Sequence, residues 1–295
     1  MYDLTGSIVV YRNPPEQVLK AVTSFLNTRL NVRLYVIDNS PDDSIRQLCA
    51  DRRVVYLFNG RNLGFGPGHN IAIMASRNEA NYHVVLNPDV YFGPEVLERL
   101  LRFARSRPEV GMIMPKVLNP DGSIQHLCKR LPAPSDLIIR RFLPRVLQHL
   151  AADRLARYEF RDQDYNSLLS VPVLSGCFMM INGTALSQVG IFDERFFMYM
   201  EDVDLCRRIH RQFKTVYFPD AAIYHGYAKG SYRSVRLMVL HIVSALLYFH
   251  KWGWFSDPER LDINRKLIVK NDGLRPLAGG EEPIIGKDFA GGGPR

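Results

Sequence analysis

Carboxylate side chains occur at two places where the surrounding sequence would hold them beside a pocket. Asp89 comes just after the short apolar run 82–86, which reads as a buried strand ended by a proline. Glu201, Asp202 and Asp204 lie within four residues at the start of an expected helix. For any one of these acids, a turn or helix-start role is the simpler interpretation. Their positions also suit cation binding by the first site, and the aromatic, apolar run before the second would set a carboxylate at the wall of a pocket.

The elements that would position Asp89 alternate between strands and helices. Strands are expected at 7–11, 33–38, 54–58 and 82–86, with helical segments between them. This alternation predicts right-handed crossovers and a parallel sheet, so the loops after the strands open on one edge. Ligands of open α/β sheets bind beyond the carboxyl ends of the strands.

Residues that suit a nucleotide follow these strands. Tyr11 could pack on a base, and Asp38 could accept a hydrogen bond from the imide N–H of that base. Arg61 could approach a phosphate, and Asp89 could hold a divalent metal that bridges a diphosphate. A turn or capping role remains open for each residue alone, but four residues at one edge favour a nucleotide pocket.

The glycine-rich segment 62–70 is expected to form a loop through Gly68 before a helix, and it matches neither common phosphate-binding motif. Its glycines are spaced Gly-x-Gly-x-Gly after the third strand, unlike the dinucleotide fingerprint, and no Gly-Lys-Ser/Thr closes it. The segment therefore gives no support for an NTPase or an NAD enzyme.

Composition is that of an ordinary globular protein, with 46% hydrophobic and 23% charged residues in 295. One large domain with an appendage, or two domains, would fit.

The charge of +8 is compatible with phosphorylated substrates or anionic lipid. Nucleic acid is the least expected partner, because no helix-turn-helix or RNA-recognition signature accompanies the charge. The four separated cysteines suit a reducing cytoplasm, and the N-terminus shows no secretory signal.

In the N-terminal half, a helix is also expected at 45–50 and a strand at 111–116. The C-terminal half contains fewer regular signals, with helices expected at 183–189, 231–252 and 257–269. The segment 131–169 reads as a basic, proline-interrupted helical insertion. The buried stretch 171–181 contains Gly176, where a ligand or another backbone segment can approach closely.

Taken in order, these motifs resemble those of the family 2 inverting glycosyltransferases, especially the rhamnosyltransferase-like branch. The residues that carry the resemblance are Ser7-Ile8-Val9-Val10-Tyr11, Val36-Ile37-Asp38-Asn39-Ser40, Asn62-Leu63-Gly64-Phe65-Gly66, Leu86-Asn87-Pro88-Asp89 and Gly190 to Leu205. The resemblance implies a GT-A nucleotide-sugar-binding fold, an α/β architecture with a mostly parallel, mixed central sheet between helices. It suggests a catalytic domain over 1–230, C-terminal helices over 231–270 and a flexible tail over 271–295.

The resemblance also implies roles for individual residues. Asp38 looks like the base-recognising acid, and Asp89 looks like the last acid of the Asp-x-Asp motif that binds Mg²⁺ or Mn²⁺, with Asn87 in place of the first. Asp202 matches the general base of the Glu-Asp motif, with Glu201 beside it, and His225 matches a further metal or diphosphate contact. The remaining site residues are Tyr11, Arg61, Asn62 and Gly64 for the donor, and Gly176, Tyr199 and Asp204 for the acceptor.

The activity implied is transfer of a sugar from a nucleotide donor to a saccharide or lipid-linked acceptor in cell-surface polysaccharide synthesis. dTDP-L-rhamnose is the first expectation for the donor, and UDP-hexoses are the alternative. A nucleotidyltransferase and a non-catalytic saccharide-binding module are the rival functions.

The expected helix 231–252 is apolar over most of its surface, with His241, Ser244 and Tyr248 forming one polar stripe. Its uncharged run, 237–250, is shorter than the roughly 17–25 residues that span a bilayer. An anionic membrane surface, a homodimer partner and the catalytic domain are all candidates to cover it. The lipid-linked acceptor implied by the resemblance favours a peripheral position on the inner face of the membrane.

Overall fold

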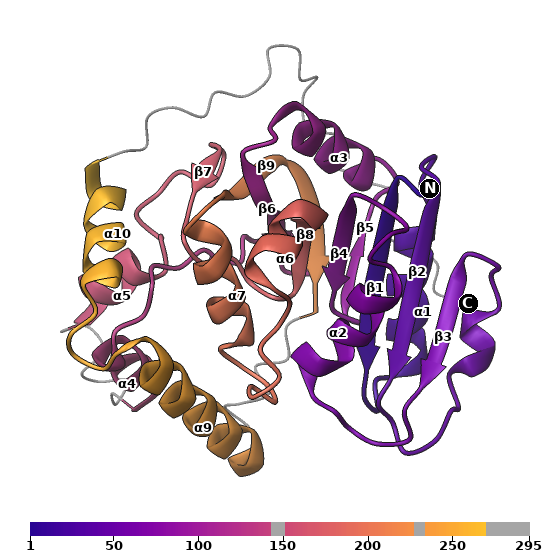
Figure 1. Ribbon diagram of the computed structural model, residues 1–295, viewed down its shortest axis with the longest axis horizontal. Helices are drawn as coiled ribbons and strands as arrows, with labels where there is room; N and C mark the ends of the chain where they lie inside the picture. Colours follow the sequence, from indigo (N-terminus) through magenta and orange to yellow (C-terminus); the bar gives the residue numbers. More distant parts are fainter. Residues whose placement is uncertain (143–150, 227–233, 270–295) are drawn as a thin grey trace.

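A nine-stranded mixed sheet organises the residues 1–142, 151–226 and 234–269, which are those that the computed structural model describes (Figure 1). The strand order is β3-β2-β1-β4-β8-β6-β9-β5, and β7 pairs with β9. The expected tail 271–295 and the expected helix start at 231 lie outside the described residues. The strands are β1 (Leu4–Val10), β2 (Val32–Asp38), β3 (Val54–Phe58), β4 (Tyr82–Leu86), β5 (Val90–Phe92), β6 (Val110–Leu118), β7 (Leu169–Ser170), β8 (Phe178–Asn182) and β9 (Lys214–His225).

The sheet is parallel over the strands predicted from the N-terminal half and mixed beyond them. β1 pairs in parallel with β2 and β4, and β2 pairs in parallel with β3. β8 then runs antiparallel between β4 and β6. β9 is parallel to β6 and antiparallel to β5. The predicted parallel half and the mixed sheet implied by the resemblance are both confirmed.

Helices cover both faces of the sheet. Residues of α2, with Tyr35 and Ile37, form one apolar cluster, whereas Leu34 and Val36 belong to the main core with α1. Because side chains alternate along a strand, α1 and α2 lie on opposite faces. The helices are α1 (Pro15–Leu26), α2 (Phe65–Ala75), α3 (Val96–Ser106), α4 (Pro134–Phe142), α5 (Ala152–Tyr158), α6 (Gly183–Val189), α7 (Glu201–His210), α9 (Val235–Trp252) and α10 (Pro258–Val269).

Two expectations for the N-terminal half are corrected. The helix expected at 45–50 is a single 3-10 turn, Arg46–Cys49. The glycine-rich segment is not a loop through Gly68, because α2 already starts at Phe65. A Cβ on Gly68 would lie 2.8 Å from the Val9 side chain, so this glycine permits α2 to approach β1 closely.

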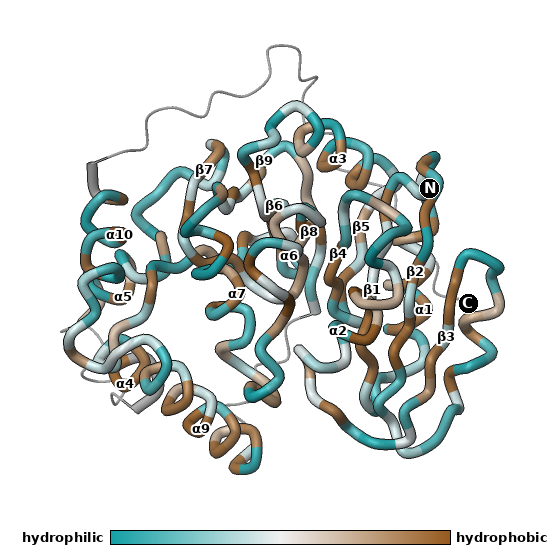
Figure 2. Tube along the Cα trace, in the orientation of Figure 1, coloured by the Kyte–Doolittle hydropathy of each residue, from teal (hydrophilic) through white to brown (hydrophobic). Residues whose placement is uncertain are grey.

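The strands that form the centre of the sheet are hydrophobic along most of their length (Figure 2). Polar groups buried among them are paired: the His83 imidazole on β4 contacts the hydroxyl groups of Thr5 and Ser7 on β1 and of Ser76 after α2. Burial lowers the pKa of His83 to about 3. These contacts fix β4, and with it the loop that contains Asp89, relative to β1 and α2.

The polar stripe of α9 faces the protein, and much of its apolar surface faces outward. Ser244 and Tyr248 are buried, and the Ser244 hydroxyl donates to the Met198 carbonyl (2.8 Å). The exposed apolar residues of α9 follow the spacing i, i+4, i+7, i+8, i+11; they are Val235, Val239, Ile242, Val243 and Leu246. We call these five residues the apolar stripe. It contrasts with the usual arrangement, in which a helix turns its apolar side to the core.

Candidate active site

Asp202 lies in the first turn of α7, and its carboxylate is anchored by main-chain donors. The Gly176 N–H donates to Oδ2 (3.2 Å), and the Val203 N–H donates to Oδ1 (2.9 Å). The turn before α7 is strained, because Tyr199 (φ 71°) and Met200 (φ 65°) both adopt left-handed backbone conformations. Such conformations cost about 1–3 kcal/mol each and are concentrated at functional sites.

Glu201 is adjacent in sequence but differs sharply in environment. It is buried beside Gly66, and its Oε2 has no hydrogen-bond partner among the described residues. Burial raises the pKa of Glu201 well above its ordinary value, and the charge of Asp202 raises it further. Glu201 is therefore held in the neutral, protonated form, while the half-buried Asp202 is the acid placed to accept a proton.

Asp89 is placed at the carboxyl end of β4, as predicted, and it meets His225 at the end of β9. Asp89 Oδ1 lies 3.4 Å from His225 Nε2. Gln125 orients the imidazole: its Nε2 donates to the His225 carbonyl (2.8 Å), and its Oε1 lies 3.0 Å from His225 Nδ1. Because Oε1 can only accept, Nδ1 carries the proton in the neutral ring and the Nε2 lone pair faces Asp89.

This donor pair fits a hard divalent cation. A carboxylate oxygen and an imidazole lone pair repel each other at 3.4 Å unless a positive charge lies with them. Within the described residues, no group of three or more His, Cys, Asp or Glu side chains comes together as a metal site. Asp89 and His225 therefore fit Mg²⁺ or Mn²⁺ only with further oxygen ligands, such as those of a bound diphosphate or water.

Cys177 shows that the two carboxylate sites are close to each other. Burial raises the pKa of the Cys177 thiol to about 12, and the charges of Asp89 and Asp202 both contribute. The main chain gives the same picture: the Asn87 N–H donates to the Cys177 carbonyl (2.9 Å), and the preceding Gly176 binds Asp202. The start of β8 thus joins Asp202 to the loop that contains Asn87 and Asp89.

The residues predicted to bind the nucleotide gather at the ends of β1, β2 and β3. Asp38 is fully buried, with Oδ1 accepting from the Ser40 N–H (2.9 Å) and Oδ2 from the Tyr56 hydroxyl (2.6 Å). Burial and the Asp38 carboxylate raise the pKa of Tyr56, so its phenol stays a donor. Tyr11 is exposed beside this cluster, and the adjacent Arg12 donates its N–H to Ser40 Oγ (3.0 Å).

The glycine-rich segment connects this cluster to the catalytic side. Gly64 has φ 94°, accepts a hydrogen bond from the Asn39 amide at its carbonyl (3.1 Å) and donates its N–H to Asn62 Oδ1 (2.9 Å). A Cβ at Gly64 would come within 2.2 Å of the Phe197 carbonyl oxygen, so only glycine fits there. Arg61, in the same segment, is exposed.

The three residues predicted for the acceptor side have different positions. Gly176 lies against Asp202 and Phe65. Tyr199 stacks on His241 of α9, with ring centroids 4.7 Å apart. Asp204 is fully buried and pairs with Arg208 (2.9 Å) and Lys251 (2.7 Å), so it stabilises the contact between α7 and α9 instead of facing a pocket.

The comparisons with known proteins agree with this geometry. The model of the family described as Glycosyl transferase family 2 matches residues 7–190. The chain belongs to glycosyl transferase family 2. This glycosyltransferase is 29% identical over 288 residues to the "N-acetylglucosaminyl-diphospho-decaprenol L-rhamnosyltransferase" of Mycobacterium tuberculosis, with 92% of each chain covered. It is also 28% identical over 210 residues to the "Low-salt glycan biosynthesis hexosyltransferase Agl10" of Haloferax volcanii, with 70% of this chain and 62% of that protein covered.

A solved structure confirms the fold class of the transferase. The crystal structure of GalNAc-T7 with UDP, GalNAc and Mn2+ has a TM-score of 0.56 at 13% identity and covers 77% of this chain. The match spans 43% of that longer chain. The glycosyltransferase thus has a GT-A fold, as the sequence resemblance implied.

Two residues of the transferase that shape the site were not predicted. Gln125 orients His225, and Cys177 lies near both Asp89 and Asp202. Their roles depend on neighbours about 100 residues away in the chain, or on the packing of β8, so no local motif reveals them. The one local signal is the turn 119–122, which folds the segment of Gln125 back along β6.

Proposed function

We propose that this enzyme transfers L-rhamnose from dTDP-L-rhamnose to a hydroxyl group of a lipid-linked saccharide. The main support for the reaction is the position of Asp202. The Gly176 N–H holds its carboxylate, and Cys177 lies near both this carboxylate and Asp89, which pairs with His225. The sugar and the acceptor class rest on the name of the mycobacterial relative, which aligns over nearly the whole chain, and the dTDP nucleotide rests on the resemblance of the sequence motifs to the rhamnosyltransferase-like branch.

In the proposed reaction, the Asp202 carboxylate takes the proton of the acceptor hydroxyl. The hydroxyl oxygen bonds to the anomeric carbon as the bond from that carbon to the nucleoside diphosphate breaks, which inverts the configuration. Gly176 and the strained turn at Tyr199 and Met200 hold Asp202 in place. Neutral Glu201 adds no second negative charge. A divalent cation held by Asp89 and His225 would offset the charge of the leaving diphosphate.

The donor nucleotide is assigned to the edge formed by β1, β2 and β3. Tyr11 offers an exposed ring for stacking on the base, and Arg61 an exposed guanidinium for a phosphate. Asp38 supports this edge through Ser40 and Tyr56; because it is fully buried and both of its carboxylate oxygens accept hydrogen bonds there, it is assigned a supporting role and not the contact with the base imide that the resemblance implied. Asn62, Gly64 and Asn87 complete the donor side.

A UDP-hexose is the alternative donor, favoured by the name of the Haloferax relative. A thermal-shift panel of dTDP, UDP and their sugars, with and without Mn²⁺, separates the two, because binding raises the stability of the native state. We expect stabilisation by the dTDP compounds and, with a lipid-linked acceptor, transfer from dTDP-L-rhamnose. Stabilisation and transfer with UDP-sugars alone would replace the proposed donor. Binding without any transfer would favour the non-catalytic module.

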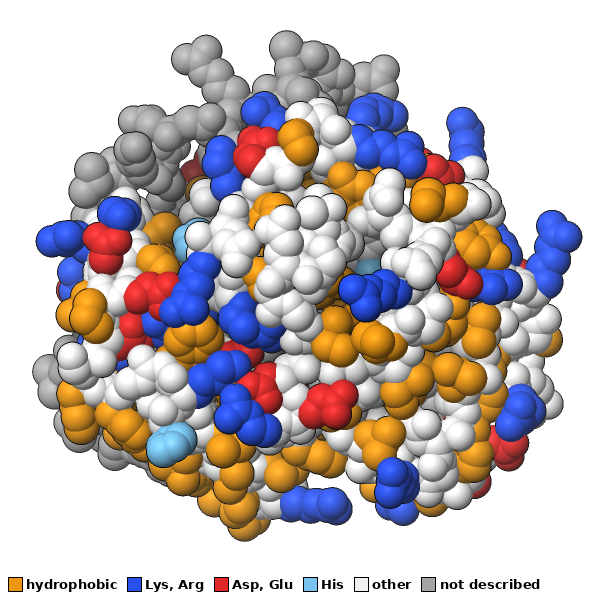
Figure 3. All heavy atoms as spheres, in the orientation of Figure 1, with side chains coloured by type: hydrophobic (Ala, Val, Ile, Leu, Met, Phe, Trp, Pro, Cys, Tyr) orange, Lys and Arg blue, Asp and Glu red, His pale blue; other side chains and the backbone are white. Residues whose placement is uncertain are grey.

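We further infer that the apolar stripe of α9 rests on an anionic membrane surface. Within the residues that the structure describes, none of the helices combines the length and apolarity needed to cross a bilayer. Hydrophobic side chains gather along the lower left edge of the molecule, where Figure 1 places α9 (Figure 3). Arg236 and His250 near the ends of α9 suit anionic headgroups. A peripheral position on the inner face follows from the lipid-linked acceptor, and a homodimer is the competing use of the same stripe.

A further inference from the structure

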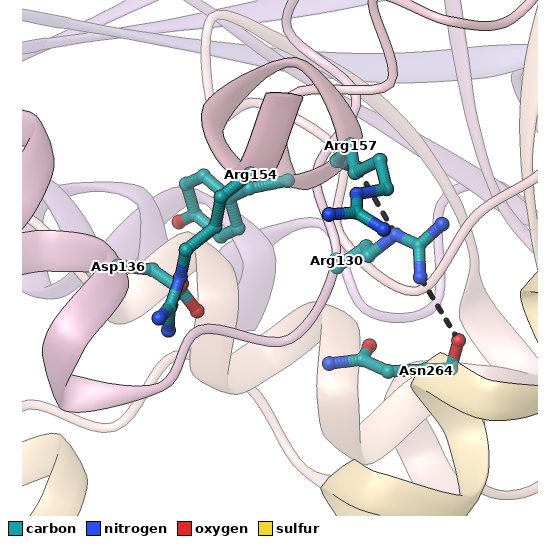
Figure 4. A pocket seen from close by; sticks show the side chains of 6 residues that line it. Arg130, Asp136, Arg154, Arg157 and Asn264 are labelled. Carbon is teal, nitrogen blue, oxygen red and sulfur yellow. Dashed lines mark hydrogen bonds and ion pairs between the residues drawn. The ribbon is translucent and has the colours of Figure 1, made fainter. Parts of the chain in front are cut away.

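A second pocket lies among α4, α5 and α10, apart from the residues assigned to catalysis (Figure 4). It has a volume of about 200 Å³. The residues that line it are Arg130, Asp136, Arg154, Arg157, Tyr158 and Asn264. Three of these six side chains are arginines and one is a carboxylate, so the lining carries a positive excess.

The single carboxylate is already paired. Asp136 accepts from Arg154 Nε (2.8 Å) at Oδ1 and from the Ala133 N–H (2.8 Å) at Oδ2. Arg130 instead donates to main-chain carbonyls, those of Arg157 (3.0 Å) and Asn264 (3.1 Å). Arg157 Nε likewise donates to the Asp153 carbonyl (3.2 Å). Among the described residues, neither Arg130 nor Arg157 has an ion pair, so two positive charges in this pocket are not neutralised.

These two charges are close to each other. Figure 4 shows the side chains of Arg130 and Arg157 next to each other, with Asn264 beside them. Burial lowers the pKa of Arg130. The negative charge of Asp162 raises this pKa in part, and the positive charge of the neighbouring Arg157 lowers it further. Arg130 is partly buried and Arg157 is exposed at the rim of the pocket. An anion that accepts hydrogen bonds from both guanidinium groups would stabilise this like-charged pair. The fork of N–H donors on arginine matches phosphate oxygens in particular.

We propose that this arginine pocket (Arg130, Arg154 and Arg157) binds the phosphate groups of a lipid-linked molecule. The identity of the ligand rests on the proposed function: it is the diphosphate that joins the acceptor sugar to its lipid. The phosphate of an anionic phospholipid has the same chemistry and is the second source.

The position of the pocket suits such a ligand. Leu131, next to Arg130, is buried in one apolar cluster with Val173 and with Val203, the neighbour of Asp202. Lys129 pairs with Val173, which is three residues before the Gly176 that binds Asp202. Because three residues span at most about 11 Å, the segment from Val173 to Gly176 connects the neighbourhood of the pocket to Asp202, the proposed base. The two helices that contribute Asp136 and Asn264 to the pocket also carry exposed apolar side chains, Ile138 on α4 and Leu261 on α10.

Arg157→Gln is the most suitable test variant, because the side chain of Arg157 makes a single hydrogen bond within the described residues and the change removes one positive charge. Arg265→Gln on α10 is the matched control, since Arg265 is exposed, pairs with Asp262 and does not line the pocket, although it follows Asn264 in the chain. Inorganic diphosphate is the probe, with EDTA present to suppress metal-dependent binding at the donor site. Calorimetry should show binding that Arg157→Gln weakens roughly tenfold or more, the effect of losing one charge-assisted contact, and that Arg265→Gln leaves unchanged.

Two further measurements identify the source of the phosphate. If the acceptor diphosphate occupies the pocket, Arg157→Gln raises KM for a diphosphate-linked N-acetylglucosaminyl lipid, but not for an alkyl N-acetylglucosaminide or for the donor. If a phospholipid occupies it, the variant loses binding to phosphatidylglycerol vesicles and keeps both KM values. Equal diphosphate binding by the wild type and Arg157→Gln, or no binding by either, overturns the proposal. The calorimetry requires no turnover, so it gives its result even if the proposed transfer reaction fails.

Discussion

Removing the charge of Asp202 tests the proposed reaction most directly at the residue scale. Asp202→Asn keeps the shape of the side chain and an oxygen to accept from Gly176, but it cannot take a proton at neutral pH. We expect kcat to fall by roughly 10²–10⁴-fold, the usual contribution of a general base. Donor affinity, measured by calorimetry with the nucleoside diphosphate and Mn²⁺, should stay within about twofold, since only the acceptor contacts Asp202 in the proposed reaction. Near-normal turnover would remove Asp202 from this role.

Glu201→Gln is the companion variant, because it replaces a neutral buried acid with a neutral amide. The pKa of Glu201 is higher in the folded protein than in the unfolded chain, where it is about 4.5. Protonated Glu201 therefore contributes its full share to the free energy of unfolding below about pH 4.5. That contribution is lost as pH rises toward and through the folded value, at about 1.4 kcal/mol per pH unit. Glu201→Gln should therefore gain stability relative to the wild type as pH rises above 4.5, as measured by urea unfolding at several pH values, and should keep most of its activity. A pH-independent difference between the two proteins would show that Glu201 is ionised in the fold.

The sequence predicted the positions of Asp89 and Asp202, but not the environments that separate them from Glu201 and Asp204. A strand end and a helix start are local features, and both acids lie where those features were expected. Burial of Glu201 beside Gly66, and pairing of Asp204 with Lys251 from α9, arise from contacts between distant segments. For this reason, four similar carboxyl groups in the sequence acquire different chemical properties in the fold.

At the scale of elements, the apolar stripe of α9 makes a prediction about membrane binding. Leu246→Gln replaces one exposed leucine, and Leu19→Gln on α1 is the control with similar exposure (49% and 45%). Burying a leucine side chain in an apolar phase is worth about 1.5–3 kcal/mol, so Leu246→Gln should weaken co-flotation with anionic liposomes roughly tenfold or more. Leu19→Gln should co-float as the wild type does. If Leu246→Gln changes the molecular mass in light scattering but not co-flotation, the stripe is a dimer interface instead.

The elements that the sequence did not reveal are those paired over long distances. β9 contains Pro219 and shifts register against β6 between Phe218 and Ala222, so its sequence does not read as one continuous strand. β5 has three residues and exists because β9 pairs with it. By contrast, β1 to β4 are recognisable as short runs rich in apolar residues, which parallel strands covered by helices require.

At the scale of the whole molecule, the C-terminal helices pack against the catalytic part through a buried ion-pair cluster. Arg207 on α7 is 1% exposed and forms two hydrogen bonds with Asp257, each 2.7 Å. Glu259 on α10 adds a further contact to Arg207 (2.6 Å), and the ring of Trp252 at the end of α9 lies 4.2 Å from the guanidinium carbon. Helix α7 also begins with Glu201 and Asp202, so the same helix joins the proposed catalytic residues to the C-terminal extension.

Asp257→Asn tests whether the extension and the catalytic part unfold as one unit. The change leaves the buried Arg207 with Glu259 as its one remaining acidic partner among the described residues, and loss of one partner from a buried pair costs about 3–5 kcal/mol. Asp262→Asn on α10, which begins directly after Asp257, is the control: its pairs with Arg265 and Lys266 are exposed, so it should leave the midpoint of unfolding almost unchanged. In urea unfolding followed by circular dichroism, Asp257→Asn should lower the midpoint of a single transition with an unchanged m value, because unfolding exposes the same surface. A separate early transition, or a shift no larger than that of Asp262→Asn, would show that α10 is not required for the stability of the catalytic part.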